Sequence, residues 1–290
     1  MKDQLLGTRL FCLFFCFFAF FFQSIAHSAD EDPISKLAWQ FGPSEGVIGD
    51  KATIQIPKGY VFLNAEETKK FQEINQNFSN GTQYIFAPEN LTWFSIFSFS
   101  PEGYIKDDEG SDANDISADK MLESQIQNTK SANEERRKRG WGTMSITGWR
   151  FQPQYDKQAR LLEWAFAAKQ DEDNSAIINY NTRILGRTGV MKVVLVASPE
   201  ILDNSVTELK LAFDGYTFNS GESYAEFREG DKVAEYGLAA LIVGGAAAVA
   251  AKKGFFAVIL AFLAGAWKLL LIPFIFALGW FKSLFTKKGR

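Results

Sequence analysis

Two apolar blocks, one at each end of the chain, most constrain what these 290 residues can form. In the N-terminal block a short basic region precedes an uncharged run at 10–22, and small residues then allow cleavage after Ala26 or Ser28. A basic start, a short apolar run and small residues before the cleavage point are typical of a secretory signal peptide. We therefore expect residues 1–28 to be a signal peptide and the following domain to be exported.

The C-terminal block begins after Glu235 and contains no acidic residue. Its first apolar run, 237–251, would give about 22 Å of helix, which is short for a hydrocarbon core of about 30 Å. Its second run, 255–281, is longer and richer in Phe, Leu and Ile. We expect residues 255–281 to span the membrane and the whole region 236–290 to anchor the chain, with its basic tail in the cytoplasm.

A helical hairpin made of both runs is the alternative to a single span. Two spans would return the basic tail to the outer side, whereas basic segments tend to stay in the cytoplasm, so a single span is favoured. The first run would then be a helix that packs beside the membrane. Ala240, Gly244 and Ala248 recur at every fourth position in it, and such small side chains allow another helix to pack closely.

Missing residue types exclude several kinds of chemistry. The only histidine, His27, and both cysteines, Cys12 and Cys16, lie in the region of the expected signal peptide and its cleavage point. The mature chain would then have no disulfide, no Cys or His metal site, and no nucleophile activated by histidine. We therefore expect no cofactor, and the composition favours a non-enzymatic role over catalysis.

Charge divides the chain in the same way. The net charge is −3, yet every charged residue after Glu235 is basic: Lys252, Lys253, Lys268, Lys282, Lys287, Lys288 and Arg290. The exported part is therefore strongly acidic, which argues against nucleic acid as a partner. The expected partners are the membrane and either another envelope protein or a second copy of the chain. The expected location is the inner membrane, with the domain on its periplasmic side.

Residues 29–235 carry the patterns of an α+β domain. Apolar or alternating runs predict strands at 52–57, 59–63, 91–100, 144–151, 161–168, 177–185 and 190–197. Helices are predicted at 64–77, at 118–139 and after Ser198, with Asn64 and Ser198 as N-caps. Because short turns join several strands, we expect one domain with a mostly antiparallel sheet and packed helices, followed by the membrane helix region.

The strand predicted at 177–185 carries the most polar pattern. Its period of two would place Asn179, Asn181 and Arg183 side by side on one face, with Arg187 in the next turn. Two amides and a guanidinium on a rigid strand could bind a carboxylate or a phosphate. An exposed polar sheet face without a ligand is the alternative, since half-buried antiparallel sheets commonly have one.

The segment before the second predicted helix is rich in carboxylates. Asp107, Asp108 and Asp115 are its candidate ligands for calcium or magnesium, because oxygen ligands suit these hard cations. The spacing does not match an EF-hand loop. A solvated acidic loop that supplies carboxylates to the first turn of a helix is the alternative.

Several blocks occur in an order that resembles a known family: "ATIQIPKGYVFL", "GYIKDD", "NEERRKRG", "GW…P…YD", "NYNTRILGRTGV" and "DKVAEYGLAALIVGG". The chain resembles uncharacterised bacterial membrane-anchored proteins catalogued as domain-of-unknown-function family number 2167. The resemblance covers nearly the whole mature chain. It implies a bacterial envelope protein with a signal peptide and a C-terminal anchor, and it implies no activity.

The sequence thus predicts a membrane-anchored protein of the cell envelope that acts as an interaction or scaffold module facing the periplasm. An anion-binding envelope sensor is the alternative, with Asn179, Asn181, Arg183 and Arg187 as its site. A carboxylate- or metal-dependent hydrolase is a further alternative.

Overall fold

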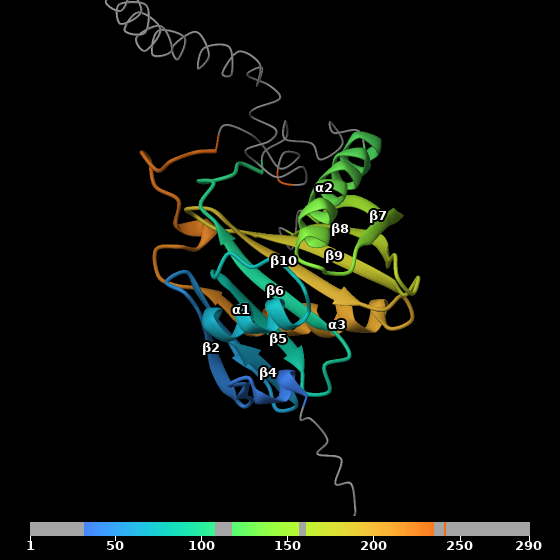
Figure 1. Ribbon diagram of the computed structural model, residues 1–290. Coiled ribbons are helices and arrows are strands. Elements are labelled where there is room, and N and C mark those ends of the chain that lie inside the picture. The colour runs from blue at the N-terminus through green and yellow to red at the C-terminus, as the bar shows by residue number, and fades with distance from the viewer. Residues whose placement is uncertain (1–31, 108–117, 157–160, 235–240, 242–290) are drawn as a thin grey trace, which may run out of the picture. The chain divides into compact units, whose positions relative to one another are not determined.

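The computed structural model describes residues 32–107, 118–156, 161–234 and Leu241 (Figure 1). The chain divides into two units, residues 1–36 and residues 37–290. In the first unit the structure describes residues 32–36, of which Pro33–Lys36 form a short 3-10 helix. The expected signal peptide and, apart from Leu241, the expected anchoring region lie outside the described residues.

An antiparallel sheet of eight strands forms the centre of the second unit (Figure 1). The strand order is β1-β4-β5-β6-β10-β9-β8-β7. The strands are β1 (Gln40–Phe41), β4 (Tyr60–Leu63), β5 (Gln83–Pro88), β6 (Phe94–Ser100), β7 (Met144–Asp156), β8 (Leu161–Gln170), β9 (Ala176–Leu185) and β10 (Val190–Ala197). Every neighbouring pair is antiparallel, which confirms the predicted type of sheet.

A second, smaller sheet covers one face of the large sheet. It contains β2 (Ser44–Ile48), β3 (Ala52–Ile56) and β11 (Tyr216–Phe218), in the order β11-β3-β2. The main hydrophobic core lies here and includes the fully buried side chains of Ile54, Phe97, Tyr180 and Leu209. The strands predicted at 52–57 and 59–63 therefore exist, but they belong to different sheets.

Helix α3 (Leu202–Ala212) packs into the same core through Leu202 and Leu209. The predicted N-cap at Ser198 is wrong. A turn at residues 199–201 intervenes, and Ile201 occupies the N-cap position without a side-chain hydrogen bond. The predicted helix after Ser198 is therefore present, whereas the Ser-Pro pair marks a turn before it.

The opposite face of the large sheet carries the other two helices. Helix α1 (Ala65–Ile74) contacts β4 and β5, and helix α2 (Ala118–Lys138) contacts β7 (Figure 1). Asn64 accepts a hydrogen bond from the Glu67 amide at 3.0 Å, which confirms the predicted N-cap. Beside α2 lies a second apolar cluster that includes Met121, Leu162, Trp164, Phe166 and Leu241.

The architecture is thus α+β, with two sheets around the main core and helices on both faces of the large sheet. Among the described residues, no helix combines the length and the hydropathy that a membrane crossing requires.

Candidate functional site

Strand β9 presents two different sets of side chains to the two faces of the large sheet. Tyr180 and Thr182 point toward the main core, where both are fully buried. Asn179, Asn181 and Arg183 alternate with them and therefore point toward the face that carries α1 and α2. The predicted row of two amides and one guanidinium is present on one face of the strand.

Arg183 is the most unusual member of this row. Only 8% of its surface is exposed, and its guanidinium lies over the ring of Trp164 at 4.5 Å from the ring centre. Its Nη1 donates a hydrogen bond to the Thr182 carbonyl at 2.9 Å, whereas its buried Nε has no hydrogen-bond partner. The aromatic face supports the cation on one side through a cation–π contact.

No carboxylate balances this charge among the residues that the structure describes. Arg183 takes part in none of their ion pairs. Burial lowers the pKa of Arg183 to about 9, because the interior disfavours the charged form. Moving one ion out of water costs several kcal/mol, so buried cations are normally paired.

A second cation lies directly across the strand pair. Lys192 of β10 is the register partner of Arg183, and its side chain is partly buried. Burial lowers the pKa of Lys192, and the positive charge of Arg183 lowers it further. Lys192 was not among the site residues predicted from the sequence. The sequence feature that could have identified it is a single lysine in an otherwise apolar strand. Because Leu185 pairs with Val190, this register places Lys192 opposite Arg183.

The two asparagines extend the polar row along β9. Both are partly exposed, and the Asn181 side-chain amide donates to the Asn179 carbonyl at 3.0 Å. We call Asn179, Asn181, Arg183 and Lys192 the polar patch. Its two cations and amide donors are the groups that recognise carboxylate and phosphate oxygens in proteins.

Arg187 does not belong to the polar patch. It lies in the turn after β9 and forms a two-point ion pair with Asp231, in which Nε and Nη2 each donate at 2.7 Å. Its Nη1 also donates to the Gly221 carbonyl at 3.3 Å. These hydrogen bonds from Arg187, together with one from the Arg228 amide, lower the pKa of Asp231 to about 2. Arg187 therefore ties the segment around Asp231 to the β9–β10 turn.

Asp107, the one predicted metal ligand among the described residues, binds two phenols. Tyr155 donates to its Oδ2 at 3.1 Å and Tyr224 donates to its Oδ1 at 2.9 Å. Asp108 and Asp115 lie outside the described residues. Within the described ranges no three acidic, His or Cys side chains gather into a possible metal site. The metal site stays a prediction.

The predicted packing residues Ala240, Gly244 and Ala248 also lie outside the described residues. Leu241, which follows Ala240 in the chain, is 5% exposed and belongs to the apolar cluster beside α2.

No curated protein matches the chain. Among solved structures, it is similar to the solution structure of cyanobacterial PsbP (CyanoP) from Synechocystis sp. PCC 6803. The two share 9% sequence identity, the match covers 60% of this chain and 95% of that chain, and the TM-score is 0.35. A TM-score this low does not establish a shared fold.

A family model gives the broader match. The family described as "Protein of unknown function (DUF2167)" matches residues 40–276, which include both sheets, the three α-helices and the polar patch. Because this match extends over most of the chain, the resemblance drawn from its ordered blocks is confirmed, and the protein belongs to this family of unknown function.

Proposed function

We propose that this protein is a membrane-anchored protein of the bacterial cell envelope whose exported domain binds a small anion at the polar patch. The observation that carries the proposal is the buried guanidinium of Arg183, which has no carboxylate partner among the described residues. A bound anion would supply the missing negative charge. It would also accept a hydrogen bond from the unsatisfied Nε of Arg183.

The chemistry of the patch favours an oxyanion. A guanidinium offers a planar set of donors that matches a carboxylate or a phosphate at two points, and Lys192 adds a second charge beside it. The low dielectric around Arg183 strengthens the attraction relative to a fully solvated site. The Trp164 ring restricts the guanidinium on one side, so the donors are held ready for the ligand.

Export by residues 1–28, anchoring by residues 255–281 and a periplasmic location are parts of the proposal that rest on the sequence. The interaction or scaffold role also stays a prediction. Crosslinking in intact cells, followed by affinity capture of the full chain, tests that role. A reproducible envelope partner supports it, and capture of unrelated neighbours in each repeat contradicts it.

The anion site is tested by thermal unfolding of the full chain in mild detergent. Sodium phosphate and sodium acetate are titrated at constant ionic strength against sodium chloride. We expect at least one of the two to raise the Tm in a concentration-dependent way, because a ligand that binds only the folded state stabilises it. Arg183→Met is expected to abolish this shift.

Arg187→Met is the matched control, because it removes a guanidinium four residues away that is already paired with Asp231. It is expected to lower the starting Tm but to keep the anion-dependent shift. The proposal is wrong if neither phosphate nor acetate stabilises the wild-type protein, or if Arg183→Met keeps the full shift.

A further inference from the structure

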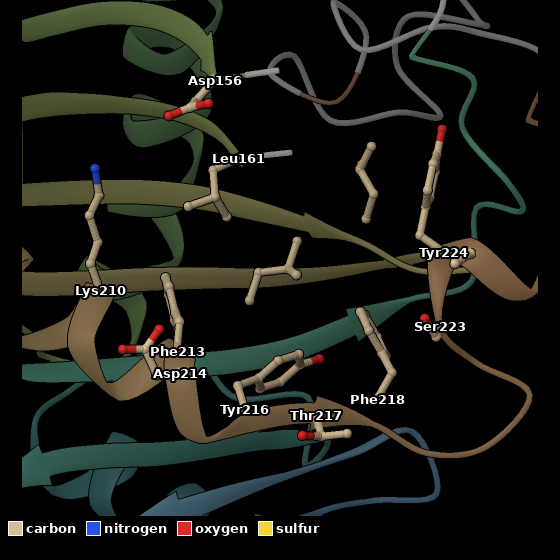
Figure 2. A pocket seen from close by; sticks show the side chains of 13 residues that line it. Asp156, Leu161, Lys210, Phe213, Asp214, Tyr216, Thr217, Phe218, Ser223 and Tyr224 are labelled. Carbon is tan, nitrogen blue, oxygen red and sulfur yellow. The ribbon is translucent and has the colours of Figure 1, made fainter. Parts of the chain in front are cut away.

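A cavity of about 650 Å³ lies on the other side of β9, away from the polar patch (Figure 2). Its floor comes from the large sheet, through Leu161 and Ile184. Its opposite wall is β11, the edge strand of the small sheet. The cavity therefore lies where the small sheet ends before it has covered β8 and β9. Its volume is in the range of about 300–1,000 Å³ that is common for small-molecule sites.

The two ends of the cavity differ in chemistry. Figure 2 shows Lys210 and Asp214 at one end, whereas Phe218 and Tyr224 lie at the other. Phe213 and Tyr216 line the space between these ends with further aromatic surface. A ligand that fills the cavity therefore needs an apolar body and a polar group at one end.

Tyr216 places a hydroxyl in this aromatic surface. Its oxygen points away from Asp214 and toward Phe218 in Figure 2. The oxygen is buried and has no hydrogen-bond partner, and burial raises the pKa of the phenol, so the group stays protonated. Buried hydroxyls are normally hydrogen-bonded. A ligand that carries a hydrogen-bonding group on its body would satisfy this one.

The charged end favours a cationic ligand group. The Lys210 ammonium is held by Glu163, at 2.8 Å from Oε2 and 3.1 Å from Oε1. Glu163 is in turn fixed by the Tyr180 hydroxyl, which donates to it at 2.6 Å. Asp214 is exposed at the same end and forms no hydrogen bond or ion pair with any residue that the structure describes. Because Lys210 is already paired with Glu163, the unpaired charge at this end is the negative one of Asp214.

We propose that this cavity binds a small molecule with an aromatic body, a protonated amine at one end and a hydroxyl at the other. The aromatic body packs over Ile184 and against Phe213. The amine meets the Asp214 carboxylate, and the hydroxyl meets the Tyr216 phenol. The site is separate from the polar patch, so either of the two proposals can fail alone.

Three probes of similar shape separate these contacts. Tyramine carries the amine and the hydroxyl, phenethylamine lacks the hydroxyl, and 3-(4-hydroxyphenyl)propionate replaces the amine with a carboxylate. Dissociation constants are measured by ligand-observed NMR on the full chain in detergent micelles. Leu161→Trp fills the cavity, so the signal that a probe still gives with this variant measures the probe dissolved in the micelle.

We expect tyramine to bind best, phenethylamine about 2- to 10-fold more weakly and the propionate most weakly, since one hydrogen bond and one exposed charge contact have effects of this order. In Tyr216→Phe, tyramine and phenethylamine should bind equally. In Asp214→Asn, the preference for tyramine over the propionate should fall. Asp203→Asn, a change of an exposed acid on α3 outside the cavity, should leave the order of the three probes unchanged.

Three outcomes overturn the proposal. The first is that no probe binds the wild-type protein more tightly than it binds Leu161→Trp. The second is that the propionate binds as tightly as tyramine. The third is that Asp214→Asn leaves the amine preference intact. Asp214 is exposed, so Asp214→Asn keeps the test decisive even if Leu161→Trp does not fold.

Discussion

Arg183 and Arg187 belong to one hairpin and lie four residues apart, yet the fold uses them in opposite ways. Arg187 is held by both oxygens of Asp231, and the two side chains are only 15% and 19% exposed. Arg183 is buried against Trp164 and has no carboxylate partner among the described residues. One guanidinium is thus tied into the structure by an ion pair, whereas the other keeps a buried Nε without a hydrogen-bond partner. The difference lies in the partner and not in the residue type.

The largest expected effect comes from removing the platform below Arg183. Trp164→Ala should lower the free energy of unfolding by about 3–5 kcal/mol, because Trp164 is 2% exposed and its removal leaves a large cavity. Chemical denaturation measures this. Trp141→Ala is the control, since Trp141 is partly exposed and packs mainly on Phe78 and Arg139. Equal losses for both variants would show that the burial of Trp164 does not make it the larger contributor to stability.

The two arginines should respond with opposite signs when each is replaced by methionine. Arg183→Met should raise the free energy of unfolding by about 1–4 kcal/mol, since it replaces an unpaired buried charge with an apolar chain of similar length. Arg187→Met should lower it, because Asp231 then loses the cation that pairs with it. Denaturation of both variants without added phosphate or acetate measures the two signs. A loss of stability in both variants would remove the distinction between them.

Of the two arginine sites, only the Arg187–Asp231 pair should respond to low pH. The Asp231 pKa falls from 3.8 to about 2 on folding, so the pair contributes its full stability above a pH of about 4 and loses it as the pH falls toward 2. The Tm difference between wild type and Asp231→Asn should therefore be largest near pH 6 and shrink toward pH 2. The difference between wild type and Arg183→Met should stay constant over this range, because Arg183 remains protonated throughout it.

The smallest expected effect is on the asparagine next to Arg183 in the polar patch. Asn181→Ala should change the free energy of unfolding by no more than about 0.5 kcal/mol, because the side chain is partly exposed and bonds only to a local carbonyl. It should weaken the anion-dependent Tm shift without abolishing it. An unchanged shift would restrict the binding site to Arg183 and Lys192.

Most strands of the large sheet could be predicted because their patterns are local, although β1 and β5 were missed. The apolar run at 91–100 and the short turn between β9 and β10 identify a strand and a hairpin without any knowledge of distant residues. In the small sheet only the strand that became β3 was predicted, and its pairing was not. Its strand β11 has three residues and pairs with β3, which lies more than 150 residues earlier in the chain. No local pattern encodes such a pairing.

In the candidate site, too, the local features could be predicted and the tertiary contacts could not. The period of two predicted that Asn179, Asn181 and Arg183 share a face, since this follows from strand geometry alone. The burial of Arg183 depends on the face that β8 presents beside it, and the role of Arg187 depends on Asp231, 44 residues away. These tertiary contacts separate the unpaired guanidinium of Arg183 from the paired one of Arg187, and the sequence pattern contains neither contact.

The contacts around the β9–β10 turn also define how force would travel through the domain. The chain before Ala234 is fixed at several points: Tyr104 pairs with it through two backbone hydrogen bonds, Arg187 holds Asp231, and Lys51 holds Glu222. A pull on the chain beyond Ala234 therefore reaches the turn at Arg187 before it reaches any edge strand. The load would pass into β9 and β10, which are flanked on both sides within the sheet, so extracting either strand would break its hydrogen bonds to two neighbours.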